Sequence, residues 1–350
     1  MNIAVFACAN GLGHTRRVIA ISNFMFKRGF SGKLTAFISK VHIDHMANWN
    51  ECKYFVNHAN IKIIDFCYPT TPNRKINSIY GKNWSKIKLP PLKEYDIVWS
   101  DNITQVVEKR NDTILTGSFL WYDVFAKNPK KNNIYNEFII KQRDIVRSIR
   151  PVMIASEYFA TPEVRFFTNF EPVGLYRYDI SYDISLREKI KKDILFSCGL
   201  GGEEENVAKE AIAQIIKNFP DPGLKLWVEP RILPEEYPKW IQKADFSKEM
   251  YQSCIAAIIR PGIGTISDVL ANRGRVFTFY NDNIFEMGHN ASVLEQMGLG
   301  EICVNPYDAF KKAILYINDN NKINQQIYLT SHLRMDGILA TAELITGRIT

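Results

Sequence analysis

Three glycine-rich loops in this sequence have the composition of anion-binding sites, and the first of them ends in a histidine. They are residues 10–14 (NGLGH), 197–202 (SCGLGG) and 260–265 (RPGIGT). Glycine lets a ligand approach the backbone closely, and the free N–H groups at a helix start favour anions. Histidine side chains ordinarily titrate near neutrality, so His14 is suited to proton transfer. None of the loops completes a Walker A sequence or G-x-G-x-x-G, which argues against a simple nucleotidase or dehydrogenase.

Alternating strands and helices are predicted around these loops. Short apolar runs indicate buried strands, and helical spacing of apolar residues indicates amphipathic helices. The expected strands are Asn2–Ala7, Leu34–Ser39, Ile61–Phe66, Asp96–Ser100, Thr113–Thr116, Val152–Ala155, Asp193–Ser197, Leu224–Val228 and a run that includes Ile255–Ile259, and the expected helices are Thr15–Arg28, Ile134–Ile149 and Glu204–Phe219. This alternation predicts an α/β protein with parallel strands. Each glycine loop then follows the carboxyl end of a strand, where such sheets bind ligands.

The 350 residues are predicted to form two domains, since they exceed what one core of ordinary size requires. A proline, a glycine and mixed charges between Glu171 and Lys192 interrupt the alternation, and the second half then repeats it. We expect an N-terminal domain over 1–175, a linker over 176–192 and a C-terminal domain over 193–330. The final segment, 331–350, is expected to be a helix, with packing back on the N-terminal domain as one option.

Composition narrows the class of protein. Hydrophobic residues make up 46% and charged residues 23% of the chain, as in folded globular proteins, and no apolar run reaches the roughly 20 residues of a membrane-spanning helix. The sequence opens without the pattern of a secretory signal. The six cysteines include no C-x-x-C pair, which favours reduced thiols over disulfides or a zinc site. We therefore expect a cytoplasmic protein.

The net charge of +7 is concentrated in the first half of the chain. Residues 1–175 hold 24 lysines and arginines against 14 acidic residues, and much of the excess lies between Arg74 and Lys93. Such a surface favours a phosphate-bearing substrate or an anionic membrane, so a peripheral position at the inner face of the cell membrane is one expectation. A solvated loop is the alternative. Nucleic acid is not expected, because no motif for binding it accompanies the charge.

A longer motif begins in the third loop. Thr265 and Asp268 have the Ser/Thr-x-x-acid spacing of a helix start, so Thr265 is predicted to cap a helix, and a well-capped helix without a ligand is the alternative. The motif continues with residues 273–275 (RGR) and 286–291 (EMGHNA). In the first half, residues 11–17 (GLGHTRR) and 95–101 (YDIVWSD) stand out in the same way.

Together these motifs resemble those of GT-B glycosyltransferases. The closest likeness is to family 28, which includes the bacterial lipid II-forming N-acetylglucosaminyltransferase, and to related transferases with an opening G-x-G-H loop. The resemblance implies two Rossmann-like domains whose parallel sheets face each other across a cleft. It also implies a transferase that moves a hexosyl or N-acetylhexosaminyl group from a nucleotide sugar, with UDP as the expected nucleotide.

The resemblance assigns the donor to the C-terminal domain. Asp268 would bind the ribose hydroxyls, and Glu286 would bind hydroxyls of the sugar, while Met287 replaces a common glutamine and leaves the sugar open. Phe246 would pack on the base, with an ordinary core position as the alternative, and the backbone of Ser247 would read the base edge. The full set implied for the donor is Gly199, Gly201, Gly202, Phe246, Ser247, Met250, Arg260, Gly262, Gly264, Thr265, Asp268, Glu286 and Asn290.

His14 is the candidate base that would remove a proton from the acceptor hydroxyl. In some GT-B enzymes an aspartate orients the matching histidine, and Asp101 could serve; the alternative is that both residues only cap or brace helices. Gly11, Gly13 and Arg17 complete the N-terminal loop.

The sequence contains no Asp-x-Asp pair, so we expect catalysis without a metal or other cofactor, and the resemblance implies inversion at the anomeric carbon. The expected acceptor is a glycan, a lipid-linked saccharide or a cell-surface polysaccharide. A nucleotide-sugar hydrolase or epimerase, or a non-catalytic nucleotide-sugar-binding subunit, are the competing functions.

Overall fold

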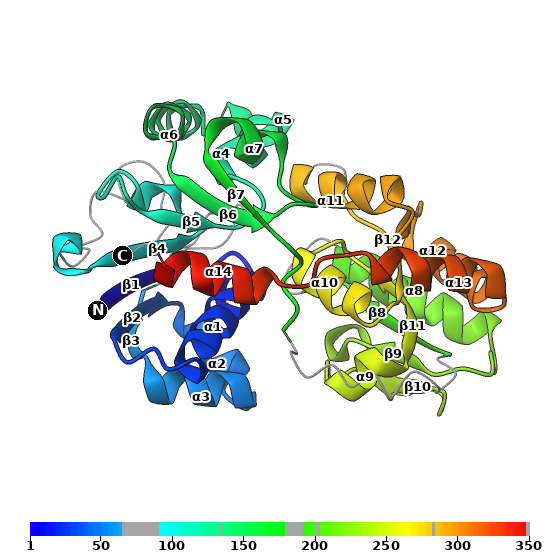
Figure 1. The fold of residues 1–350 in the computed structure, drawn as a ribbon. Helices are drawn as coiled ribbons and strands as arrows, with labels where there is room; N and C mark the ends of the chain where they lie inside the picture. The colour runs from blue at the N-terminus through cyan, green and yellow to red at the C-terminus, as the bar shows by residue number, and fades with distance from the viewer. Residues whose placement is uncertain (65–90, 134, 179–191, 200–203, 282–283, 348–350) are drawn as a thin grey trace. The chain divides into compact units, whose positions relative to one another are not determined.

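The computed structural model describes residues 1–64, 91–133, 135–178, 192–199, 204–281 and 284–347 (Figure 1). The chain divides into two compact units, of which the first comprises Met1–Tyr176 with Asp336–Thr350 and the second comprises Arg177–Met335. Most of the basic segment between Arg74 and Lys93, and the predicted donor residues Gly201 and Gly202, lie outside the described residues.

The first unit is built on a seven-stranded sheet in the order β3-β2-β1-β4-β5-β6-β7, and all of its neighbouring strands are parallel. Its strands are β1 (Asn2–Ala7), β2 (Lys33–Ile38), β3 (Asn60–Ile63), β4 (Ile97–Asp101), β5 (Ile114–Thr116), β6 (Val152–Ser156) and β7 (Asn169–Val173). Ile3 to Ala7 of β1 have no exposed surface, as expected of a central strand covered on both faces.

The helices of the first unit include the one that carries His14. They are α1 (Leu12–Lys27), α2 (Lys40–Met46), α3 (Asn50–His58), α4 (Trp121–Ala126), α5 (Pro129–Asn132), α6 (Asn136–Ile149), α7 (Pro162–Phe167) and α14 (Gly337–Thr346). The last of these packs against α1, β6 and β7, although it follows the whole second unit in the sequence. At its start a Cβ on Gly337 would lie 2.7 Å from the carbonyl oxygen of Gly174, so only glycine fits this contact.

The second unit repeats the architecture with six parallel strands in the order β10-β9-β8-β11-β12-β13. They are β8 (Asp193–Ser197), β9 (Leu226–Val228), β10 (Ile241–Lys243), β11 (Cys254–Ile259), β12 (Arg275–Thr278) and β13 (Gly300–Ile302). The helices are α8 (Glu204–Asn218), α9 (Lys248–Ser253), α10 (Ile263–Ala271), α11 (Phe285–Gln296), α12 (Pro306–Ile317) and α13 (Asn320–Ser331). None of the helices in the described parts of the chain is long and apolar enough to cross a membrane.

In each sheet the strand order reverses at one internal point. In the first sheet the chain proceeds outward in one direction from β1 and in the other from β4, and in the second sheet β8 and β11 take these places. Ligands of open α/β sheets bind outside the carboxyl ends of the strands at such a switch point. All three glycine loops, and Asp101 at the end of β4, are therefore located where the topology favours a ligand.

Candidate functional site

His14 and Asp101 form a hydrogen-bonded pair at the switch point of the first sheet. His14 lies in the first turn of α1, directly after β1, and Asp101 is the last residue of the neighbouring strand β4. The Nδ1 atom of His14 lies 2.7 Å from Oδ1 of Asp101, and both side chains are buried. The predicted pairing is present. His14 does not cap α1, because Gly11, with φ of 127°, is the N-cap of that helix. Asp101 does not cap the short 3-10 helix Thr104–Val106 after β4, because Ile103 is its N-cap.

The Asp101 carboxylate accepts hydrogen bonds from three side chains. Besides His14, Arg17 donates from Nε to Oδ2 at 2.7 Å and from Nη2 to Oδ1 at 2.8 Å, and the Thr116 hydroxyl donates to Oδ2 at 2.8 Å. Trp99 Nε1 in turn donates to the Thr116 oxygen at 2.8 Å. Burial alone would raise the pKa of Asp101, but the Arg17 charge and the hydrogen bonds outweigh it and hold that pKa below its ordinary value.

An ionised Asp101 fixes the tautomer of His14. A carboxylate can only accept, so Nδ1 carries the proton of the neutral ring, and Nε2 has the lone pair. Phe119 and Trp121 lie beside the ring, with centroids 6.1 and 6.5 Å from its own. The arrangement is that of a general base oriented by an acid, since Nε2 can accept a proton from a hydroxyl group.

In the second unit, the start of α10 offers backbone N–H groups to an anion. The helix begins at Ile263 with Gly262 as its N-cap, three residues before the predicted cap, so Thr265 lies within the first turn and does not cap the helix. No described side chain caps this helix. The N–H groups of Ile263, Gly264 and Thr265 therefore have no acceptor within the helix. A Cβ on Gly262 would meet no atom within 4 Å, so the approach to these groups is open.

The loop after β8 is already engaged by a carboxylate of the chain itself. Glu229, which follows β9, accepts with Oε2 from the backbone N–H groups of Cys198 and Gly199 at 3.0 and 2.9 Å and from the Ser197 hydroxyl at 2.8 Å. Its other oxygen accepts from Arg231 Nε at 2.9 Å. Gly199 was predicted to line the donor site, and its N–H group could donate to a diphosphate there only if Glu229 left this position.

The other predicted donor residues near α10 differ in exposure. Asp268 is buried in α10, and Arg260 at the end of β11 lies 3.9 Å from the buried carboxylate of Glu204. Glu286 lies partly exposed in the first turn of α11. Asn290, which is also buried, donates from Nδ2 to the carbonyl oxygen of Pro261 at 2.9 Å, so its amide holds the glycine loop in place.

The neighbouring Met287 has only 3% of its surface exposed and is a core residue of the second unit. A buried methionine at this place packs against other apolar side chains and has no polar atom to offer a sugar hydroxyl.

The predicted base-binding segment contains a strained aromatic residue. Phe246 has φ of 55°, a left-handed backbone that a bulky side chain rarely adopts, and its ring is half-buried and therefore no ordinary core residue. Ser247 caps α9, and its own N–H group donates to Asp245 Oδ1 at 2.9 Å, which leaves little of its backbone to read a base. Met250 is buried.

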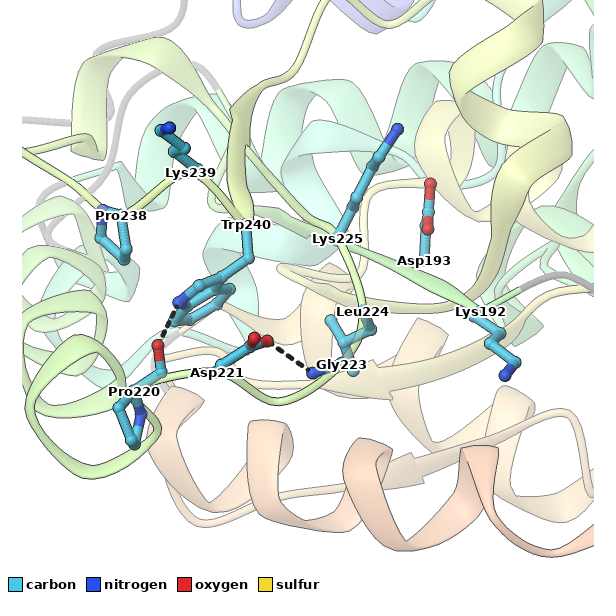
Figure 2. A pocket seen from close by; sticks show the side chains of 10 residues that line it. All are labelled: Lys192, Asp193, Pro220, Asp221, Gly223, Leu224, Lys225, Pro238, Lys239 and Trp240. Atoms are coloured by element: carbon cyan, nitrogen blue, oxygen red, sulfur yellow. Dashed lines mark hydrogen bonds between the residues drawn. The ribbon is translucent and has the colours of Figure 1, made fainter.

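A depression of 630 Å³ lies at the opposite edge of the second sheet. Figure 2 shows the side chains that line it. It lies beside the amino ends of β8, β9 and β10, and the Trp240 ring is held there by a hydrogen bond of 3.0 Å from Nε1 to the carbonyl oxygen of Pro220. The residues that line it are Lys192, Asp193, Pro220, Asp221, Gly223, Leu224, Lys225, Pro238, Lys239 and Trp240. Because the glycine loops follow the carboxyl ends of the strands, this depression is separate from the candidate site.

Among the described residues, no group of three or more His, Cys, Asp or Glu side chains is placed to hold a metal ion.

Three residues that contribute to the site were not predicted from the sequence. Thr116 and Glu229 belong to no sequence motif. Each lies at or just after the carboxyl end of a strand next to a glycine loop, and this position could have marked them as site residues. Tyr176, which stacks on Arg17, had no such signal.

No protein-family model and no curated protein matches this sequence. Solved structures match along the whole chain. The glycosyltransferase of kitacinnamycin is 14% identical, with 100% of this chain and 99% of that one covered and a TM-score of 0.63. Arabidopsis thaliana UGT89C1 complexed with quercetin is 11% identical, with coverage of 100% and 99% and a TM-score of 0.62. UDP-glucose: anthocyanidin 3-O-glucosyltransferase in complex with UDP is 10% identical, with coverage of 99% and 99% and a TM-score of 0.63.

The chain has the GT-B fold. The predicted fold class, with two sheets of parallel strands and helices, is thereby confirmed. At these identities the likeness shows the fold alone, so the chemistry of this GT-B protein must be argued from its own residues.

Proposed function

We propose that this GT-B protein is a metal-independent, inverting glycosyltransferase that moves a sugar from a UDP-sugar to a hydroxyl group. The observation that carries the proposal is the contact of 2.7 Å between His14 Nδ1 and Asp101 Oδ1 at a switch point of the fold. Among the GT-B neighbours, the UDP-glucose: anthocyanidin 3-O-glucosyltransferase was solved in complex with UDP, and UGT89C1 was solved with UDP-L-rhamnose.

The base in this proposal is His14. Its Nε2 takes the proton of the acceptor hydroxyl as the oxygen attacks the anomeric carbon from the side opposite the diphosphate. The new carbon–oxygen bond forms as the bond to the diphosphate breaks, which inverts the anomeric carbon. Asp101 stabilises the imidazolium that results, and the nucleoside diphosphate leaves with the bonding electrons.

The donor is proposed to bind at the start of α10. The first-turn N–H groups of Ile263, Gly264 and Thr265, together with the helix dipole, would hold the diphosphate and stabilise the charge that develops on it. Asp268 lies in the same helix and would accept hydrogen bonds from the ribose hydroxyls. Phe246 would stack on the uracil, which gives its strained backbone a function.

For the acceptor we propose a glycan, a lipid-linked saccharide or a cell-surface polysaccharide, as in family 28. The support is the G-x-G-H loop at 11–14 and the basic first half of the chain, which favours an anionic acceptor or membrane surface. UGT89C1 was also solved with quercetin, so small aromatic hydroxyl compounds belong in any acceptor screen.

A thermal-shift panel of UDP, dTDP, GDP and their sugars tests the donor. A ligand that binds only the folded protein at 100 times its Kd adds about 2.7 kcal/mol of stability. We expect UDP and UDP-sugars to raise the Tm, and a panel in which no nucleotide raises it would contradict the proposal.

Release of UDP from the stabilising UDP-sugar is then followed with and without acceptors. Acceptor-dependent release that is lost in His14→Gln, with donor binding intact, supports transfer. Rapid release without any acceptor would favour the hydrolase instead.

A further inference from the structure

The depression at the amino ends of β8, β9 and β10 has the size of a ligand site, and the proposed transfer makes no use of it. Its volume of 630 Å³ falls within the roughly 300–1,000 Å³ of small-molecule sites. Asp193 begins β8, Lys225 directly precedes β9 and Trp240 directly precedes β10, and these strands are neighbours in the sheet. Adjacent strands lie about 4.8 Å apart, so the row of three amino ends spans about 10 Å. Such a length suits a segment of an extended chain.

The Trp240 ring provides a fixed apolar surface in this depression. Its Nε1 atom donates to the carbonyl oxygen of Pro220 at 3.0 Å, and its own carbonyl oxygen accepts from the N–H group of Leu226 at 3.0 Å. The ring packs against the apolar core of the second unit and is only half-buried. A side chain that is already fixed loses little conformational entropy when a ligand binds. The exposed part of the indole can therefore pack against the apolar face of another ring.

Three lysines line the depression without ion-pair partners. Figure 2 shows Lys192, Lys225 and Lys239 spread around the Trp240 ring and not gathered at one point. Within the described part of the chain, none of their ammonium groups forms an ion pair with a carboxylate. Positive charges that no carboxylate neutralises attract anions, and charges that are spread out favour a ligand with more than one negative group.

Two carboxylates of the same lining can accept hydrogen bonds from hydroxyl groups. Asp193 accepts with Oδ2 from Trp227 Nε1 at 2.9 Å, and Asp221 accepts with Oδ1 from the N–H group of Gly223 at 3.0 Å. The second oxygen of each carboxylate accepts no hydrogen bond from a described residue, so it can accept one from a ligand. Both carboxylates also disfavour a ligand that is anionic along its whole length, such as a phosphodiester backbone.

We infer that this depression binds a short segment of an acidic saccharide chain. A pyranose ring has an apolar face for Trp240, hydroxyl groups that can donate to Asp193 and Asp221, and, in acidic saccharides, anionic substituents for the lysines. Single-stranded nucleic acid also combines rings with negative charges, but its sites stack successive bases on several aromatic side chains. Among the described residues that line the depression, only Trp240 is aromatic. The inference goes beyond the proposed transfer, because this site would hold a glycan without reacting with it.

Isothermal titration calorimetry of the full chain, without any nucleotide, tests the inference. The acidic probes are tetragalacturonic acid and a heparin-derived tetrasaccharide, and maltotetraose is the neutral counterpart. We expect an acidic probe to bind with an affinity that falls as the salt concentration rises, and maltotetraose to give no detectable heat of binding. Trp240→Leu should weaken the acidic probe about tenfold, because the sugar ring loses its aromatic support. The matched control is Tyr237→Leu, which removes an exposed aromatic side chain outside the lining and should leave the Kd unchanged.

The lysines provide a second test, which is needed because Trp240 also packs on the core and its replacement could unfold the unit. Replacing Lys225 and Lys239 together by glutamine should weaken the acidic probe about tenfold and reduce its salt dependence, since both side chains are exposed and contribute mainly charge. The matched control is Lys243→Gln, at the carboxyl end of β10 and outside the depression. It should leave the Kd unchanged.

Two results would overturn the inference: no binding of either acidic probe, or binding that neither Trp240→Leu nor the double lysine variant weakens. Tighter binding of a short oligothymidylate than of both saccharides, at the same salt concentration, would also overturn it and assign the depression to nucleic acid. Because no nucleotide sugar is present, a protein without transferase activity can still bind the acidic probe, and an active transferase can fail to bind it. The test therefore separates this inference from the proposed function.

Discussion

Replacement of Asp101 by asparagine should both destabilise the first unit and abolish the function of His14 as a base. The substitution keeps the size and shape of the side chain but exchanges one acceptor oxygen for an NH2 group. Arg17 donates to both oxygens, through Nε to Oδ2 and through Nη2 to Oδ1. Whichever way the new amide turns, its NH2 group therefore faces an N–H group of Arg17, and the guanidinium is left buried without a matching charge.

The magnitude follows from these contacts. Removing one partner of a buried ion pair costs about 3–5 kcal/mol, because the remaining charge is uncompensated. With about 2 kcal/mol per M as the urea dependence of a unit this size, a loss of about 3 kcal/mol lowers the unfolding midpoint by roughly 1.5 M. An amide turned toward His14 would also donate to Nδ1 and shift the proton to Nε2. A comparable change in a Ser-His-Asp triad lowers kcat about 10⁴-fold.

The assay is urea unfolding with amide hydrogen exchange read strand by strand. Amides of β4 and β5 report on the first unit, and those of β11 and β12 serve as an internal reference in the second. The matched control is Asp112→Asn, which breaks another two-point contact, from Arg110 at 2.6 and 3.0 Å, at a side chain that is 67% exposed. It should cost less than about 1 kcal/mol. If the amides of β4 are equally protected from exchange in both variants, the buried ion pair contributes no more stability than the exposed one, and the reasoning is wrong.

Other perturbations test separate parts of the site. The difference in unfolding free energy between wild type and Asp101→Asn should shrink below about pH 4. Folding lowers the pKa of Asp101, so the carboxylate stabilises the folded protein above its unfolded pKa of about 3.9, and this contribution is lost as pH falls through the folded pKa. A difference in urea midpoint that stays constant down to pH 2 would contradict this. His14→Gln should lower kcat by about 10²- to 10⁴-fold and leave the calorimetric Kd of UDP unchanged. Phe246→Gly should raise the unfolding free energy by about 1 kcal/mol, because glycine relieves the strained backbone, and it should weaken the binding of UDP. The control Arg150→Gly, at a residue with φ of 49°, should also raise the unfolding free energy but leave the binding of UDP unchanged. Burial raises the pKa of the Cys198 thiol to about 12, so peptide mapping after iodoacetamide at pH 8 should find it unmodified in the folded protein.

Periodicity was sufficient to predict the strands that are buried on both faces. The strand at Asn2–Ala7 begins and ends where predicted, and so does that at Asp193–Ser197, because a central parallel strand is one continuous apolar run. Edge strands carry a weaker signal. β7 was not predicted because Pro172 interrupts it, and proline is tolerated there since β7 has a neighbour on one side only.

The candidate site was predictable only where one motif supplied both residue type and position. The pairing of His14 with Asp101 was implied by the resemblance to GT-B enzymes, and the structure brings the two residues together because β1 and β4 lie side by side in the sheet. The start of α10 was misplaced because Thr265 has the spacing of a cap, whereas the backbone of Gly262 begins the helix earlier. The contacts of Glu229 with the β8 loop join residues about 30 positions apart, and no local pattern encodes them.

The contacts of Glu229 also bear on where an anion would bind in the second unit. In the β8 loop, the N–H groups of Cys198 and Gly199 already donate to a buried carboxylate, and an incoming phosphate would have to displace a charge of its own sign. At α10 the corresponding groups have no capping side chain, and the glycine before them leaves open space. An anion gains most where N–H groups lack an acceptor, because only there does it replace unmet hydrogen bonds rather than existing ones. We therefore expect a diphosphate to bind the first-turn N–H groups of α10 in preference to those of Cys198 and Gly199.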